Sequence, residues 1–326
     1  ILGLEKSPIS PIIIAIILGT LIGNTIPLVQ KYNDGFEFSI KYLLKLGIIF
    51  LGIRLSISDI LSYGLQGLIV IIPSIFLSII IAINIRQFFK VSNNLSMLIA
   101  VGTSICGATA IAALAPSINA KKEEISYAVA NITLFGVIAM IAYPYFAEWY
   151  FNENEIKSGL FLGTSIHETS QVAAAGLIYD QQFNSPETLN VATVTKLIRN
   201  TFLVIMIPLF AFLYNRGDVK NKKYSIFDIF PYFVLGFIGM ILFRNVGDQI
   251  FLNENNNYLM WEKLIEYFKI LATAFLTMAM AAVGISINLN ELKSMGYKPF
   301  IVGLIAAVTV GLISLIYIET IFKLIT

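Results

Sequence analysis

The chain has 326 residues, of which 57% are hydrophobic and only 13% are charged, and its formal net charge is +2. An average soluble domain carries about 25% charged residues, and a mean hydropathy of +0.80 is too high for a single soluble core. The composition therefore excludes a soluble globular protein, and the small net charge gives no ground for a nucleic-acid partner. The single cysteine, Cys106, excludes a disulfide within the chain and a cysteine-based metal cluster.

Apolar stretches close to the roughly 20 residues of a membrane-spanning helix follow one another along the chain. They predict spanning helices at about 9–27, 37–55, 62–84, 123–147, 187–214, 227–244, 263–288 and 298–321. Two further apolar segments, 95–119 and 157–180, are interrupted by small polar residues. The sequence thus predicts an all-α polytopic membrane protein, with about eight spanning helices and two interrupted segments in a single transmembrane domain over 1–326. Because the sequence starts at Ile1 and not at methionine, we expect upstream residues, such as another helix, to be missing from it.

The tetrapeptide Gly-Thr-Ser-Ile occurs in both interrupted segments, at Gly102–Ile105 and at Gly163–Ile166. Paired interruptions of this kind point to the binding site of a transporter. Two half-helices that meet there would offer backbone N–H groups to an anion and carbonyl groups to a cation. The alternative is close helix packing through small residues. The predicted binding residues of these segments are Thr103, Ser104, Cys106, Gly107, Thr109, Thr164, Ser165, His167, Glu168, Thr169, Ser170 and Gln171.

Internal repeats predict the topology. Residues 51–64 match residues 283–296 in a shared frame of Gly-Ile, alternating apolar positions, an acid and Ser-x-Gly. Paired helices lie an odd number of crossings apart, which predicts inverted repeats. The interrupted segments fit this symmetry only if each enters and leaves by the same face, as a re-entrant hairpin; the alternative is two broken helices that cross the bilayer. The full repeat pairs are 37–70 with 269–302 and 95–147 with 157–211.

The charged loops favour the re-entrant hairpins. With both segments re-entrant, one side collects the basic residues Lys31, Arg86, Lys90, Lys121, Lys122, Arg216, Lys220, Lys222, Lys223, Lys293 and Lys298. The opposite side collects the acidic residues Glu148, Glu153, Glu155, Asp180 and Glu187. This distribution is the positive-inside pattern of helical membrane proteins.

Two cationic residues, Lys196 and Arg199, lie inside the predicted helix at 187–214 and share one of its faces. Ionisable side chains within a membrane mark a functional site by default. We predict that they bind an anionic substrate, which Arg199 could hold through two oxygens, or that Lys196 is a proton-coupling site. The alternatives are an ion pair with Glu168 or Glu187, or snorkelling from a shallower depth. Further polar contacts are predicted for Asn131, Thr195 and Asn200.

The same motifs carry a family resemblance. They are residues 102–116 and 163–176, together with Lys121–Glu124, Tyr127–Gly136, Leu46–Ser56 and Met278–Gly284. On these motifs the chain resembles the YeiH-like family of sulfate exporters over nearly its whole length. The resemblance implies a multi-pass secondary transporter of the bacterial inner (plasma) membrane, distantly similar to bile-acid symporters and sodium/proton antiporters. One departure is that the family usually carries an extra amino-terminal helix, which is absent from this sequence.

Together these features predict a secondary active transporter of a small anion (sulfate, an organosulfonate or a carboxylate), coupled to H⁺ or Na⁺ through alternating access. The alternative is a cation/proton antiporter in which Lys196 and Glu168 form the ion-coupling pair. Because His167 is the single histidine and Gln171 occupies the second histidine position of a zinc-protease motif, we expect neither an enzyme nor a metal site. We expect no cofactor beyond a bound Na⁺ or a proton. The expected partners are a small anionic solute and the lipid bilayer, and a homodimer is considered beside a monomer.

Overall fold

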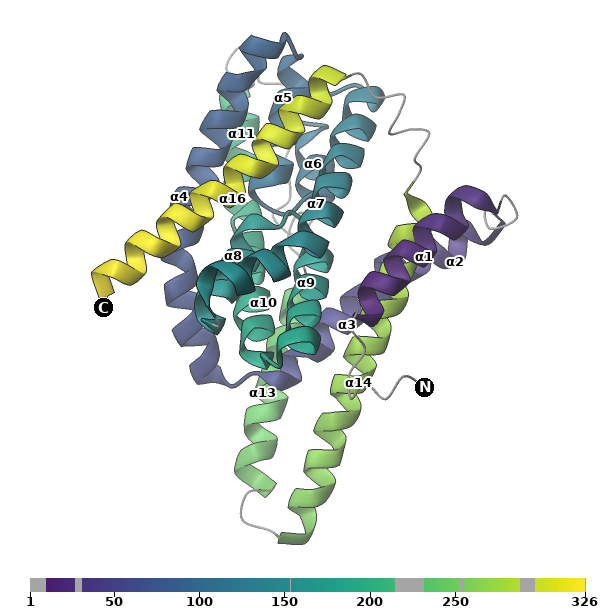
Figure 1. Cartoon of the computed structure of the whole chain (residues 1–326), viewed down its shortest axis with the longest axis vertical. Helices are drawn as coiled ribbons and strands as arrows, with labels where there is room; N and C mark the ends of the chain where they lie inside the picture. Colours follow the sequence, from purple (N-terminus) through teal and green to yellow (C-terminus); the bar gives the residue numbers. More distant parts are fainter. Residues whose placement is uncertain are drawn as a thin grey trace.

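The computed structural model describes residues 10–26, 31–152, 154–214, 232–251, 255–287 and 297–325. Every regular element in these ranges is a helix (Figure 1). Six helical stretches are long and apolar enough to cross a membrane, which confirms the predicted all-α membrane class. They are α4 (Ile57–Phe89), α7 (Lys122–Phe151), α10 (Pro186–Thr201) continued by α11 (Leu203–Tyr214), α13 (Phe233–Phe251), α14 (Asn255–Ser286) and α16 (Tyr297–Ile325). Some predicted features lie outside the described residues. They are the basic cluster at 216–223, the acidic residue Glu153, and the part of the repeat copy from 288 to 296, which includes Lys293.

Two predicted spans differ from this pattern. The first, α1 (Pro11–Thr25), has only 15 residues. The predicted single helix at 37–55 is divided into α2 (Asn33–Phe38), the π-helical turn η2 (Ser39–Leu43), α3 (Leu44–Leu51) and the 3₁₀ turn η3 (Gly52–Arg54). The α-helix ends at Gly52, where the missing side chain lets the Phe237 carbonyl of α13 approach the backbone. The number of spans and the inverted symmetry therefore stay predictions.

Each interrupted segment forms two helices separated by a short break. The first contains α5 (Asn93–Ser104) and α6 (Ala108–Leu114), and the second contains α8 (Glu155–Ser165) and α9 (Thr169–Phe183).

Hydrogen bonds join the entry of each segment to its exit. Ser92, the N-cap of α5, donates to Glu124 in the first turn of α7 (2.5 Å). Thr188, in the first turn of α10, donates to the carbonyl of Glu155, which begins α8 (3.1 Å). Each segment thus enters and leaves the fold at one end, as a hairpin does.

The helices form two bundles that lie side by side in Figure 1. In the first, which we call the outer bundle, α1 and α3 pack against α14, and α13 packs against α3. In the second, the hairpin bundle, α8 and α9 pack against α10, α5 packs between α4 and α7, and α16 crosses α4 and α8. Each bundle contains members of both predicted repeat copies. The boundary between the bundles therefore does not separate the first copy from the second.

Glycines bring helices within each bundle into close contact. In the outer bundle, a side chain at Gly284 on α14 would run into the α1 backbone at Ile16. In the hairpin bundle, a side chain at Gly163 of α8 would meet the Ala192 carbonyl of α10 at 2.7 Å. Small residues allow such close backbone packing in membrane proteins. Gly163 thus has the packing role that the sequence left open as an alternative.

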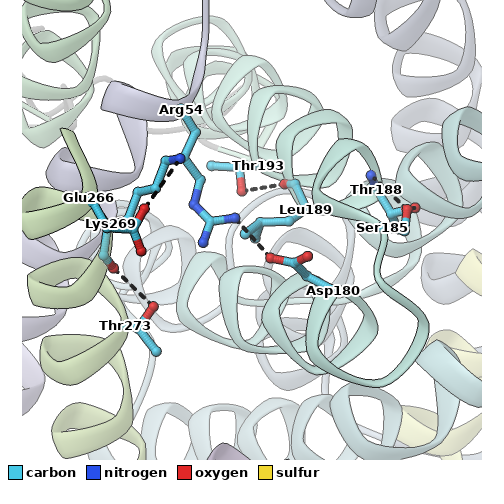
Figure 2. Close-up of polar contacts among 9 residues, drawn as sticks. All are labelled: Arg54, Asp180, Ser185, Thr188, Leu189, Thr193, Glu266, Lys269 and Thr273. Atoms are coloured by element: carbon cyan, nitrogen blue, oxygen red, sulfur yellow. Dashed lines mark hydrogen bonds and ion pairs between the residues drawn. The ribbon is translucent and has the colours of Figure 1, made fainter. Parts of the chain in front are cut away.

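The two bundles meet mainly along α9. Near its C-terminal end, Asp180 accepts a hydrogen bond from Arg54 Nη1 at 2.9 Å, an ion pair between side chains of different helices (Figure 2). The next residue, Gln181, accepts a hydrogen bond from Ser10 at 2.7 Å. These links lie about 18 Å along α9 from its N-terminal end, since a helix rises about 1.5 Å per residue.

Candidate functional site

The two Gly-Thr-Ser-Ile sequences end the first helix of each hairpin. Their four hydroxyl groups donate to carbonyl oxygens one turn earlier: Thr103 to Ile99, Ser104 to Ala100, Thr164 to Leu160 and Ser165 to Phe161. Such local bonds compete with regular helix geometry and favour a break. All four side chains are buried. Their hydroxyl protons are therefore already used within the helices that they end.

The ammonium group of Lys196 lies between the two breaks. It donates to the carbonyl oxygens of Ile105 and Ile166, each at 3.0 Å, and to that of His167. An ammonium group has three hydrogens, so each has an acceptor. Because Lys196 is fully buried, its charge is stabilised by the free carbonyl groups at the C-terminal ends of α5 and α8.

Arg199 makes a second set of contacts with the same two helix ends. Its Nε donates to the Ser104 carbonyl at 2.7 Å and its Nη2 to the Thr103 carbonyl at 2.5 Å. Its Nη1 donates to the carbonyls of Thr164 (2.6 Å) and Ile166 (3.3 Å). The guanidinium group thus bridges the first hairpin to the second. Within the described residues, neither cation forms an ion pair with a carboxylate.

Glu168 lies at the start of the returning helices. Glu168 is the N-cap residue of α9, and its side chain accepts a hydrogen bond from the Ser170 side chain in the first turn of that helix. Its Oε1 also accepts from the backbone N–H of Ala108, the first residue of α6 (3.3 Å). Gln171 completes the cap through its Oε1, which accepts from the Glu168 N–H, while its Nε2 donates to the Thr133 carbonyl on α7 (both 3.3 Å). One carboxylate therefore receives hydrogen bonds at the N-termini of both returning helices.

These contacts leave the site with an excess of positive charge. A helix terminus carries about half an elementary charge. The two C-terminal ends therefore offset about one of the two charges of Lys196 and Arg199. The two N-terminal ends similarly offset about one charge, that of Glu168. The hairpin tips thus retain about one positive charge in a buried setting.

A cavity of about 530 Å³ opens beside Glu168, between the two bundles. Its apolar wall consists of Ile40, Ile125, Val129, Leu134, Val283 and Ile287, with the small residues Ala108 and Ala130. The polar lining residues are Ser126, Thr133, Ser286 and Glu168. Residues of α7 and of the hairpin tips thus face residues of η2 and of the end of α14. Among the described residues that line it, Glu168 is the charged one.

The other predicted residues occupy varied positions around the tips. His167 is 1% exposed, and its Nδ1 has no hydrogen-bond partner among the residues that the structure describes. Cys106 and Ser170 are buried, whereas Thr109 is exposed. Gly107, with a φ of 73°, allows the turn between α5 and α6 and brings the backbone against the Glu168 side chain.

The three residues of α7 and α10 that were predicted to make additional polar contacts have different surroundings. Asn200 donates to the Thr169 hydroxyl at 2.8 Å, so it joins α10 to the start of α9. Asn131 packs against Gly303 of α16. Thr195 is fully buried beside Gly163. The described residues contain no group of three or more His, Cys, Asp or Glu residues suited to a metal ion.

Sequence reasoning missed most of the cavity wall. Ser126 lies in a long apolar helix where no local motif distinguishes it, Val129 lies in the motif Tyr127–Gly136 that had no site residue assigned beyond Asn131, and Ser286 comes from a segment far away in the chain. One signal was available for Ser286, because it occupies the position of Arg54 in the repeated Gly-Ile frame. The pairing of these distant segments is visible only in the folded chain.

Comparisons with known proteins agree with this membrane architecture. The family model described as Conserved hypothetical protein 698 matches residues 2–303. The UPF0324 membrane protein SAG1125 of Streptococcus agalactiae is 32% identical over 313 residues, which cover 96% of this chain and 90% of that protein. The UPF0324 membrane protein FN0533 of Fusobacterium nucleatum is 33% identical over 317 residues, with the same coverage of both chains. No solved structure matches the chain.

A third relative bears on the cellular location. The UPF0324 inner membrane protein YeiH of Escherichia coli is 32% identical over 307 residues, which cover 91% of this chain and 81% of that protein. This similarity confirms the predicted YeiH-like resemblance, and with the six apolar helices it places the chain in the inner membrane. The chain belongs to the Conserved hypothetical protein 698 family, the family of the UPF0324 membrane proteins.

Proposed function

We propose that the chain is a secondary active transporter of a small anion, with protons coupled to transport through Glu168. The observation that carries this proposal is the cavity beside the paired helix breaks, where Glu168 meets the N-termini of α6 and α9. In membrane transporters, discontinuous helices place such ends at the substrate site.

The charge at the hairpin tips supports an anion. Lys196 and Arg199 are held by carbonyl groups, so in this arrangement they act on a solute through their field rather than by direct contact. The excess positive charge of about one unit would stabilise an anion in the cavity, where low polarity strengthens the interaction. A direct anion contact by either cation would require the helix ends to rearrange.

Glu168 suits the coupling role because its carboxylate occupies hydrogen-bond donors that an anion would also use. Protonation of Glu168 would remove its negative charge and weaken the hydrogen bonds that it accepts from the Ala108 N–H group and the Ser170 hydroxyl. These donors would then become available to the transported anion. Binding of the anion and binding of the proton would thereby favour each other, which is the requirement for coupling.

Alternating access would follow from movement of one bundle against the other. The cavity lies between the bundles at the Glu168 end of α9, whereas the Arg54–Asp180 and Ser10–Gln181 contacts join them toward its other end. A solute at Glu168 thus has an opening on one side and packed helices on the other. A second conformation, in which the cavity is closed and the Arg54–Asp180 and Ser10–Gln181 contacts are separated, would release the solute on the other side of the membrane.

The test uses purified protein in proteoliposomes that contain a pH-sensitive dye. Wild type should show proton flux that depends on an added anion, and Glu168→Gln should lose this flux while it still exchanges labelled anion across the membrane. Glu266→Gln, a change of an exposed carboxylate on α14, is the matched control and should behave as wild type. Anion-dependent proton flux that persists in Glu168→Gln would refute the coupling role.

A second candidate is a cation/proton antiporter, which the acidic lining of the cavity favours because Glu168 could bind a cation directly. This candidate predicts proton flux that requires Na⁺ or another cation and does not respond to anions. The same vesicles, with the cation replaced by choline, distinguish the two candidates. Lys196 does not contact Glu168 as an ion pair, so Glu168 alone would carry that exchange.

A further inference from the structure

The cavity wall also bears on the class of anion, an inference that rests on the proposed function. Of the twelve described residues that line the cavity, eight are apolar and none is lysine or arginine. The apolar side chains come from both bundles, with Val129 and Leu134 on α7 facing Val283 and Ile287 at the end of α14. Polar groups are concentrated in three hydroxyl side chains and Glu168.

Inorganic sulfate fits this wall poorly. A fully hydrated dianion that enters must exchange its water for protein hydrogen bonds, and burying a charge without such partners is costly. The hydroxyl of Ser286 already donates to the Ala282 carbonyl at 2.9 Å. A cavity of about 530 Å³ is also within the range that accommodates a small organic ligand.

We infer that the transported anion is an organic one, with a single acidic group and an apolar body of several carbon atoms. The acidic group would lie at Glu168, beside the N-terminus of α9, and the body would lie against Val129, Leu134, Val283 and Ile287. Each methylene group that the wall removes from water should then increase the affinity about fourfold.

The experiment compares sulfate with unbranched alkanesulfonates of one to eight carbon atoms, a series in which only the apolar body changes. Anion-dependent proton flux into wild-type proteoliposomes gives the concentration for half-maximal flux of each compound. We expect this concentration to fall about fourfold per methylene over the first members, and we expect no response to sulfate. Protein-free vesicles correct for partition of the longer compounds into lipid.

Two variants test the wall itself. Val129→Phe on α7 and Val283→Phe on α14 narrow the cavity from opposite bundles, so each should remove the preference for the longer sulfonates while short ones are still transported. Ile138→Phe is the matched control, because Ile138 lies on the same helix as Val129 and is 52% exposed. The use of two wall variants keeps the test valid if one of them fails to fold.

The outcomes separate the inference from the proposed function. Sulfate-driven flux, or affinity that does not change with chain length, would overturn the organic class and leave anion transport in place. Proton flux that no anion changes would overturn both. A chain-length preference retained in both wall variants would also contradict the assignment to this cavity.

Discussion

The Arg54–Asp180 ion pair offers the sharpest test of movement between the bundles. It joins η3 to α9, toward the end opposite the cavity, and its side chains are 14% and 19% exposed. Loss of one partner from a hydrogen bond between charged groups costs about 1.5–3 kcal/mol, and partial exposure favours the lower value. Because 1.4 kcal/mol is a factor of ten, Arg54→Gln or Asp180→Asn should increase the population opened at this end about tenfold.

Cysteine labelling measures this population. In a Cys106→Ser background, a single cysteine at Leu177, which is 1% exposed and lies one turn before Asp180, should react slowly with a membrane-impermeant maleimide. Arg54→Gln and Asp180→Asn should each increase that rate about tenfold, following the opened population. The exchanged pair Arg54→Asp with Asp180→Arg should restore most of the protection.

The matched control is Arg244→Gln, which breaks the 2.6 Å pair between Arg244 and Asp248 within α13. That pair does not join the bundles, so the labelling rate at position 177 should stay unchanged. Equal rates in wild type, Arg54→Gln and Asp180→Asn would refute the argument that this ion pair holds the bundles together.

Further predictions concern the hairpin tips. Lys196→Met should lower the melting temperature strongly, because it leaves the buried carbonyls of Ile105 and His167 without a donor, at a cost of about 1–3 kcal/mol each, and leaves the Ile166 carbonyl only its 3.3 Å bond from Arg199. Arg199→Lys keeps the charge but cannot reproduce the four contacts of the fork, so its melting temperature should lie between wild type and Arg199→Met. Gly107→Ala should destabilise the protein by about 1–2 kcal/mol or more, because of its positive φ and the nearby Glu168 side chain, whereas Gly35→Ala, with no atom within 4 Å, should be tolerated. Thermal unfolding in detergent, monitored by intrinsic fluorescence, measures all of these, and an unchanged Lys196→Met midpoint would contradict the contacts described for its ammonium group.

The helix breaks could be predicted because both segments carry the same local run of small polar residues. In both Gly-Thr-Ser-Ile copies the hydroxyls bond to the preceding turn, and the glycine allows close packing. The long helices followed from apolar length alone. The division of residues 33–54 did not, since its short turns depend on contacts such as that between Gly52 and α13.

The roles of the two cations could be predicted only in part. Their position in a membrane helix indicated a specific partner, and the sequence favoured an anionic substrate. In the structure Lys196 and Arg199 contact carbonyls up to 96 residues away in the chain, and an anion at these residues stays a prediction. These carbonyl partners depend on how both hairpins direct the C-terminal ends of α5 and α8 toward α10. No local sequence pattern predicts this arrangement. The Arg54–Asp180 pair, 126 residues apart, is hidden from sequence for the same reason.

The packing within each bundle limits how the proposed transporter can move. Gly163 holds α8 against α10, and Lys196 and Arg199 on α10 hold both hairpin tips, so α10 and the tips should move as one body. Opening the breaks themselves would leave two cations and several carbonyls unpaired in a buried setting. Each unpaired group costs about 1–3 kcal/mol, so the total cost would be many kcal/mol. Separating Arg54 from Asp180 costs far less. We therefore expect the bundles to move against each other while the helix breaks stay intact, so that Glu168 changes the side to which it is open without losing its neighbours.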